Sequence, residues 1–371
     1  MGKYIVRRLI QAIPVLIGIS IVTYGILRIA PGGPTQRFAQ NPRVTQAQID
    51  AFRVRWGLDD PVWLSYLKWV GLVGEDDQSP PPLINGLPGG VLTIGPLTIQ
   101  LPGGDNGILH GDFGYSITDG RPVTDVIGDR IWPTLILAGT AYVIWLTLAL
   151  ILGVYAAVRR YSFFDSALTV FNYIGYSLPT FWFGIILITI FSQGTPFKWF
   201  PAGGMWDART VPIFGTPEYW AFFGANPLQA LGDLTLHLTL PVICLVTVNI
   251  AFDSRFIRAS MLDSLNQDFV RTARAKGVAE RTVVFRHALR NALLPVVTNV
   301  GLEIPFLFTG AIITETIFSW PGMGRQFIQA TASFDYPVLM GILIVTSLIV
   351  VIANLVADVA YAVVDPRVKY D

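Results

Sequence analysis

The stretch TLILAGTAYVIWLTLALILGVYAAV, from Thr134 to Val158, decides the fold class of this 371-residue chain. It contains no charged residue and is followed at once by Arg159 and Arg160. A helix rises about 1.5 Å per residue, so about 20 apolar residues cross the roughly 30 Å hydrocarbon core of a bilayer. The stretch is long enough for this and predicts a membrane-spanning helix.

Five further stretches predict spans by the same criterion: Leu9 to Ala30, Ser166 to Phe191, Leu234 to Phe252, Asn291 to Ile317 and Val338 to Val364. We therefore expect an all-α membrane protein with six transmembrane helices, whose second and third spans form a helical hairpin. The first stretch follows basic residues, as a signal peptide would. It is too long for one and no small-x-small cleavage site follows it, which favours a retained anchor.

The composition agrees with a membrane protein and excludes several other classes. Hydrophobic residues make up 52% of the chain and charged residues 14%, and the net charge is +1. A water-soluble protein would carry roughly 25% charged residues, and a nucleic-acid-binding protein would carry a basic excess. The single cysteine excludes a disulfide scaffold, and no HExxH, GxSxG or GxxxxGK[ST] string occurs. We expect no enzymatic activity, no metal and no cofactor bound by this chain itself.

The distribution of basic residues predicts the orientation in the membrane. More than half of the 26 Lys and Arg residues fall in the two termini and in the links after the second and fourth spans. The opposite loops are longer and carry fewer. By the positive-inside rule, both termini are expected in the cytoplasm.

These spans divide the chain into expected regions. Residues 1–30 form the N-terminus and the first span, 31–133 an extracytoplasmic subdomain, 134–365 the membrane core and 366–371 a cytoplasmic tail. Within the subdomain, Thr45 to Val73 reads as helical and is broken by Pro61. Residues 74–110 are rich in Pro and Gly, and two short apolar runs around Gly95-Pro96 predict a β-hairpin.

The cytoplasmic link over residues 253–290 holds the densest charge cluster. Leu265, Phe269 and Ala273 are spaced i, i+4 and i+8, which predicts a short amphipathic helix from about Ser264 to Lys276, with Gly277 as its left-handed cap. Such a link could lie on anionic headgroups or fit the groove of a partner protein, and its compact, alanine-rich form favours the groove. The predicted contact residues are Leu265, Asp268, Phe269, Arg271, Thr272, Ala273, Arg274, Ala275, Lys276 and Gly277.

Two acidic residues lie in the fifth predicted span. Glu303 is near its middle, where a charge is costly unless it faces protein or water, so it either lines a pathway or makes an interhelical hydrogen bond. Glu315 lies near its external end and is followed by Pro321 and Gly322. These three residues predict an ordered turn, either near an external gate or with a purely structural role.

Several motifs then give the chain a resemblance to a known family. The strongest are RTARAKG from Arg271 to Gly277, HALRNALLP from His287 to Pro295 and ETIFSWPGMGR from Glu315 to Arg325, with GDFGYS from Gly111 and DPR from Asp365 in support. Together and in this order, nearly end to end, they resemble the membrane subunits of bacterial ATP-binding-cassette (ABC) importers, specifically the B-type permease of the dipeptide, oligopeptide and nickel group.

The resemblance implies that RTARAKG is a coupling helix that inserts into a cytosolic ATPase. It also implies a location in the bacterial inner membrane and four partners: two ATPase subunits that use ATP and Mg, a second homologous permease that completes a heterodimer, and an extracytoplasmic solute-binding protein. Each permease would form half of the pathway. The solute remains open among peptides, nickel chelates and glutathione-like molecules.

The chain departs from the family pattern at two places, and two alternative functions stay open. Arg271-Thr272-Ala273 stands where the general importer signature has Glu-Ala-Ala, as is usual in the peptide branch, and residues 74–110 look like an insertion. A channel or ion-coupled transporter acting alone is the main alternative, but it leaves RTARAKG unexplained. An intramembrane enzyme is weaker still, because no pair of catalytic carboxylates emerges from the spans.

Overall fold

A computed structural model describes residues 2–29, 60–73, 91–94, 97–100, 107–192 and 197–364. The chain forms two compact units. Unit 1 comprises Met1–Leu9, Asp129–Gln326 and Ile349–Asp371, and unit 2 comprises Ile10–Gly128 and Phe327–Leu348.

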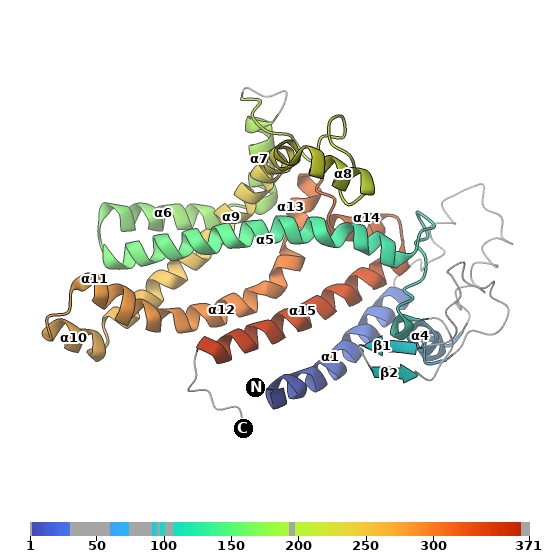
Figure 1. Ribbon diagram of the computed structural model, residues 1–371, viewed down its shortest axis with the longest axis horizontal. Helices are drawn as coiled ribbons and strands as arrows, with labels where there is room; N and C mark the ends of the chain where they lie inside the picture. Colours follow the sequence, from blue (N-terminus) through green and yellow to red (C-terminus); the bar gives the residue numbers. More distant parts are fainter. Residues whose placement is uncertain are drawn as a thin grey trace. The chain divides into compact units, whose positions relative to one another are not determined.

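Helices dominate the described residues (Figure 1). The long ones are α1 (Gly2–Ile29), α5 (Val123–Val158), α6 (Phe163–Ser177), α7 (Thr180–Phe191), α9 (Pro227–Leu265), α12 (Leu289–Gly310), α14 (Met323–Ala332) and α15 (Tyr336–Val364). The short ones are α4 (Val62–Val70), α8 (Pro217–Ala225), α10 (Asp268–Ala275), α11 (Glu280–Thr282), α13 (Ile312–Ile317), the 3-10 turn η1 (Ile108–His110) and the π-helical turn η2 (Val283–Ala288).

Four of the described helices are long and apolar enough to span a membrane: Val6–Ile29, Val123–Val158, Pro227–Leu265 and Tyr336–Val356. The pair α6 and α7 makes a fifth candidate if its two bent halves count as one span. These helices agree with a multi-span membrane protein. The six-span count stays a prediction.

The third predicted span is broken, which corrects the expectation of one continuous helix over Ser166–Phe191. Helices α6 and α7 meet at an angle of 101°. Pro179 cannot donate a backbone hydrogen bond, and its ring disfavours a helical conformation at Leu178. Leu178 accordingly has φ −81° and ψ 121°, and the chain turns there. The α5–α6 hairpin is present (Figure 1). The ring of Tyr155 in α5 is edge-on to that of Phe164 in α6.

The region of the fifth predicted span, Asn291 to Ile317, holds two helices. Helix α12 has 22 residues and ends at Gly310, and α13 has six and begins at Ile312. The fourth predicted span is much longer than expected, because α9 runs for 39 residues to Leu265. Asp253 to Leu265 continue this helix, since no Gly or Pro interrupts the stretch. The cytoplasmic location of residues 253–290 stays a prediction.

Unit 1 has a continuous apolar core. Trp145 of α5 belongs to it, and Ile257 and Met261 of α9 and Trp320 in the segment after α13 are among its most buried side chains. Small residues allow close contacts between helices. A Cβ atom added to Gly153 of α5 would lie 2.7 Å from the carbonyl oxygen of Ser254.

Unit 2 is held by aromatic and polar contacts. Tyr66 of α4 packs against Tyr24 of α1 and shares a hydrogen bond of 2.8 Å with Ser20. Asp335 accepts hydrogen bonds from the hydroxyl of Ser116 and the backbone N–H of Thr118.

Two strands, β1 (Val91–Ile94) and β2 (Leu97–Gln100), pair antiparallel with Val91 opposite Gln100 and Ile94 opposite Leu97. Residues 45–59 of the helix predicted over Thr45–Val73, most of the remaining 74–110 segment and the DPR motif lie outside the described residues.

Candidate functional site

The RTARAKG motif lies on α10 and the turn after it, at the end of α9 (Figure 1). Helix α10 begins at Asp268, since Asn266 and Gln267 separate it from α9. It ends at a left-handed turn, as predicted: Gly277 has φ +75°, and the backbone N–H of Val278 donates to the carbonyl of Ala273 over 3.2 Å. Glycine suits this turn because other residues are strained at positive φ.

The buried face of α10 differs from the predicted one. Leu265 belongs to α9, and Phe269 is 40% exposed. Val270 and Ala273, three residues apart, form the buried side instead, with exposed fractions of 0% and 7%. They join a cluster with Val283 and Val284 of η2. The break at Asn266–Gln267 changes the helical phase, so an i, i+4, i+8 pattern drawn across it fails.

The other predicted contact residues lie on the exposed side of α10 and its turn. They are Asp268, Phe269, Arg271, Thr272, Arg274, Ala275, Lys276 and Gly277. Helix α10 and its turn thus offer a surface with three basic side chains and one aromatic ring, while Ala273 faces inward. We call this surface the α10 face.

An ion pair connects α10 to the following helix. The guanidinium of Arg274 donates to both carboxylate oxygens of Glu280 over 2.6 and 3.1 Å. These hydrogen bonds hold the pKa of Glu280 below its ordinary value and raise that of Arg274. Both side chains are well exposed, so water screens the pair and its contribution to stability is small.

A buried hydrogen bond joins the end of α9 to the end of η2. The hydroxyl of Ser264 donates to the carbonyl oxygen of Ala288 over 2.7 Å. The π-helical turn over Val283–Ala288 widens the backbone there, and such turns leave carbonyls in need of a partner. Helix α10 is therefore held at its base from both sides, through apolar packing and through this bond.

Glu303 belongs to a polar cluster between helices. The amide of Asn299 donates to Glu303 and, over 3.5 Å, to Asp253 of α9. Asp253 is 4% exposed and also accepts a 3.0 Å hydrogen bond from the indole N–H of Trp145. One oxygen of Glu303 is buried without a hydrogen-bond partner among the described residues. The hydrogen bond of Glu303 to Asn299 lies within α12, and it is Asn299 that connects this helix to Asp253 of α9. The interhelical and pathway alternatives for Glu303 both stay predictions.

The sequence did not single out Asp253, because the fourth predicted span ended at Phe252. The helical pattern that continues without a breaker from Phe252 to Leu265 is the signal that could have placed it on α9.

The Glu315 turn, from Glu315 to Arg325, is an ordered and buried structure. The Glu315 carboxylate is 0% exposed and accepts from the hydroxyl of Thr134 over 2.7 Å and from the backbone N–H of Arg325 over 3.0 Å. A Cβ atom on Gly322 would lie 2.3 Å from this carboxylate. Pro321 precedes Gly322 in the turn. The predicted turn is therefore present, and its chemistry is that of packing and hydrogen bonding.

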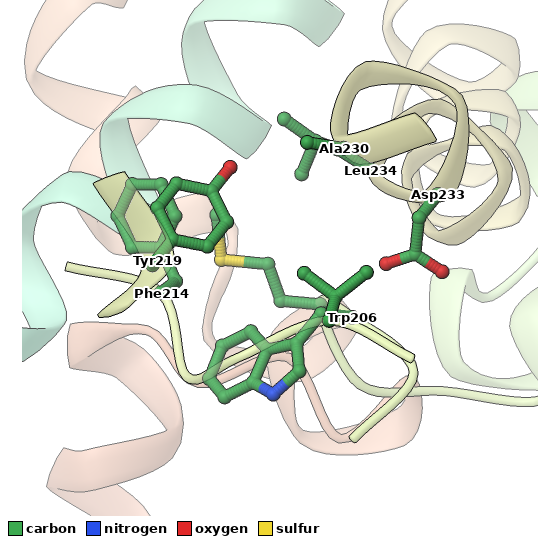
Figure 2. A pocket seen from close by; sticks show the side chains of 8 residues that line it. Trp206, Phe214, Tyr219, Ala230, Asp233 and Leu234 are labelled. Carbon is green, nitrogen blue, oxygen red and sulfur yellow. The ribbon is translucent and has the colours of Figure 1, made fainter. Parts of the chain in front are cut away.

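A small pocket lies where the segment before α8 meets α8 and α9. Figure 2 shows Trp206, Phe214 and Tyr219 facing Ala230 and Leu234, with Asp233 as the one carboxylate in its lining. Asp233 accepts a hydrogen bond of 3.1 Å from the backbone N–H of Asp207. The lining is thus mostly apolar, and its carboxylate is already engaged.

Comparison with known proteins connects these features to a family. Residues 149–370 match the binding-protein-dependent transport system inner membrane component, and residues 1–80 match the N-terminal region of such components. The chain belongs to this family. It is 38% identical to the oligopeptide transport system permease protein AppB of Bacillus subtilis over the full length of both. It is 33% identical to the dipeptide transport system permease protein DppB of Escherichia coli, over all of this chain and 99% of the relative.

This membership settles the class of protein. The chain is the membrane permease subunit of an ABC importer, a multi-pass inner-membrane protein that transports and does not itself catalyse a reaction. A permease of this kind works with ATPase and solute-binding partners.

Proposed function

We propose that this permease imports peptides or similar small solutes and forms half of the translocation pathway with a second, homologous permease. The names of its relatives, which are oligopeptide and dipeptide permeases, support the solute class. Six spans, cytoplasmic termini and an extracytoplasmic segment over residues 31–133 complete the proposed topology. A solute-binding protein would deliver the solute on that side.

The α10 face is the proposed docking surface for the cytosolic ATPase, which uses ATP and Mg. The observation that carries this proposal is the division of α10 into two sides. Val270 and Ala273 fix the helix to its own chain, whereas Phe269, Arg271 and Thr272 are exposed. A fixed helix that exposes an aromatic ring and basic side chains suits a protein groove, because rigid exposed anchors lose little entropy on binding.

Glu303 and the Glu315 turn have proposed roles in the translocation pathway. We propose that Glu303 contributes to the wall of the pathway and that Glu315, Pro321 and Gly322 hold the helix ends that form the external gate. The buried hydrogen bonds of Glu315 support a positioning role more than direct contact with solute.

Co-purification of the ATPase with tagged permease tests the docking surface. Phe269→Ala should lower the amount of bound ATPase about tenfold, since an exposed aromatic anchor commonly contributes more than 1 kcal/mol. Phe163→Ala is the matched control, because Phe163 is an exposed phenylalanine at the start of α6. Equal ATPase binding by both variants would reject the α10 face as the dock. ATP-independent uptake by permease alone would instead support a channel or ion-coupled transporter.

A further inference from the structure

The turn between α5 and α6 has an unusual backbone. Tyr161 has φ +62°, in the left-handed region that favours glycine. Its backbone N–H donates to the Asp165 carboxylate over 2.9 Å, and the backbone N–H of Asp165 donates to the hydroxyl of Ser162 over 3.2 Å. These hydrogen bonds hold the turn in one conformation. A strained backbone persists where the surrounding structure fixes it, and such positions concentrate at functional sites.

Burial of the Tyr161 side chain does not explain the strain, because this side chain is 77% exposed. The guanidinium of the neighbouring Arg160 lies 4.4 Å from the centre of the Tyr161 ring and donates to its hydroxyl oxygen. An exposed tyrosine at a position that suits glycine loses backbone freedom without gaining burial. Its effect is to hold an aromatic ring and a guanidinium together at the surface.

The same turn carries a second arginine and a second aromatic ring. Arg159 and Arg160 are both exposed, and neither forms an ion pair within the part of the chain that the structure describes. Phe163, the first residue of α6, is 89% exposed. Residues 159–163 therefore present two guanidinium groups and two aromatic rings. We call these five residues the basic turn.

An exposed apolar stripe on α5 leads to the basic turn. The stripe is 40% to 58% exposed and consists of Leu148, Ile151, Tyr155 and Val158. These residues are three and four positions apart, so they share one side of the helix. Helix α5 is long and apolar enough to span a membrane, and Val158 is its last residue. Apolar side chains followed by basic and aromatic ones match the order of lipid tails and headgroups at a membrane interface.

Along α9, the basic turn lies further from α10 than the depth of a headgroup layer. The Asp165 carboxylate accepts hydrogen bonds of 2.6 and 2.8 Å from Arg258 of α9. Helix α9 continues from Arg258 to Leu265, which adds about 10 Å at 1.5 Å per residue. The headgroup layer of one leaflet is roughly 5 to 8 Å deep. This separation favours lipid at the basic turn and a soluble partner at α10.

We propose that the basic turn binds the headgroup phosphate of an anionic lipid. Arg159 and Arg160 contact the phosphate, because a guanidinium forms paired, charge-assisted hydrogen bonds with its oxygens. Tyr161 orients Arg160 through its ring and hydroxyl, and Phe163 lies against the upper part of the acyl chains. The bound lipid fixes the end of α5 at the membrane surface, whichever solute is transported.

Lipid binding to the detergent-purified importer, counted by native mass spectrometry, tests the proposal. Wild-type protein should bind phosphatidylglycerol in preference to phosphatidylcholine. Arg159→Gln with Arg160→Gln should weaken phosphatidylglycerol binding about twentyfold, because each basic residue near an anionic surface contributes about fivefold. Arg281→Gln with Arg286→Gln removes the same charge at exposed positions on α11 and η2 and is the matched control. Equal losses in both double variants would indicate attraction by net charge alone and would overturn the proposal.

Tyr161→Gly separates the strain from the lipid contact. Glycine adopts φ +62° without strain, so the melting temperature of this variant should equal or exceed that of the wild type. Its affinity for phosphatidylglycerol should fall about threefold, because Arg160 loses the ring and hydroxyl that orient it. An unchanged affinity would show that the strained tyrosine does not serve the lipid, and it would overturn the proposal.

A fluorophore at the basic turn measures its position independently of affinity. Bimane attached at Phe163→Cys should be quenched by lipids with a nitroxide on the headgroup, in vesicles of phosphatidylcholine and phosphatidylglycerol. Bimane attached at Phe269→Cys, at an exposed phenylalanine of the α10 face, should be quenched much less. The native Cys244 is 0% exposed and gives little background. Equal quenching at the two positions would overturn the proposal.

Two other occupants of the basic turn would give different results. Glycerol 3-phosphate should compete poorly with phosphatidylglycerol, because it lacks the acyl chains that contact Phe163. Effective competition would identify a site for free phosphate. ATPase co-purification should be unchanged in Arg159→Gln with Arg160→Gln, and its loss with retained lipid binding would identify a protein dock. Either result would overturn the proposal.

Discussion

The Glu315 turn and the α10 segment, from Asp268 to Ala288, contain two of the strongest motifs, yet their residues are used in opposite ways. Glu315, Phe318 and Trp320 are each 0% exposed, so the turn directs its large side chains and its carboxylate into its own chain. Helix α10 buries only Val270 and Ala273 of its eight residues. A distinctive sequence can therefore reflect internal packing in one place and an open surface in another. Variants in the Glu315 turn should therefore lose stability, whereas variants on the α10 face should lose ATPase binding.

Gly322→Ala should give the largest effect. The new Cβ atom would lie 2.3 Å from the Glu315 carboxylate and would displace it from Thr134 and Arg325. A buried carboxylate that loses its partners costs about 3 kcal/mol or more. Thermal unfolding in detergent, followed by tryptophan fluorescence, should show a clearly lower midpoint. Gly139→Ala is the control, because open space surrounds Gly139 within its helix. Equal melting of both variants would contradict the tight packing.

Val270→Ala should destabilise the α10 segment by about 2 kcal/mol, because buried methyl groups leave a cavity when they are removed. Phe269→Ala, at the adjacent exposed position, should leave the melting temperature nearly unchanged and weaken ATPase binding instead. Melting and co-purification measured on the same two samples separate the buried side from the α10 face. If Phe269→Ala lowers the melting temperature as much as Val270→Ala does, the separation of α10 into a buried and an exposed side is wrong.

Ser264→Ala should cost about 1 to 2 kcal/mol, since it leaves the buried carbonyl of Ala288 without its hydroxyl donor. Amide hydrogen exchange over residues 268–288 should become faster, because the end of η2 loses its attachment to α9. Ser260→Ala, one turn earlier on the same helix, provides the comparison. Similar exchange rates in both variants would show that the Ser264 bond does not restrain the segment.

The Arg274–Glu280 pair should give the smallest effect. The pKa of Glu280 is lower in the folded protein than in the unfolded chain, where it is about 4.3. The pair therefore contributes its full stabilisation above about pH 4.3 and loses it only as the pH falls through the lower pKa of the folded protein. Melting should therefore not respond to this pair between pH 6 and 8. The exchange Arg274→Glu with Glu280→Arg restores the pair but reverses the charges on the α10 face, so it should preserve melting and weaken ATPase binding. A melting temperature of the protein that depends on this pair between pH 6 and 8 would argue against the assignment.

The membrane class was predictable because apolar runs such as Thr134–Val158 depend on composition alone. The left-handed cap at Gly277 was also predictable, since local backbone chemistry determines it. The buried side of α10 was not, because a two-residue break at Asn266–Gln267 changes the helical phase. Pro179 is a local signal for the bend at Leu178, but the apolar composition of Ser166–Phe191 predicted one continuous span.

Helix α9 has 39 residues, which gives a length of about 58 Å, nearly twice the thickness of the hydrocarbon core. Pro241 has no backbone N–H and interrupts the hydrogen-bond ladder of α9, so the part from Val242 to Leu265, about 36 Å long, is the rigid one. Rotation of this part by about 5° around Pro241 moves its α10 end by roughly 3 Å. Asp253 lies on this part, between Pro241 and α10. A small displacement at α10 therefore tilts the part of α9 that carries Asp253 without any change in its internal hydrogen bonds.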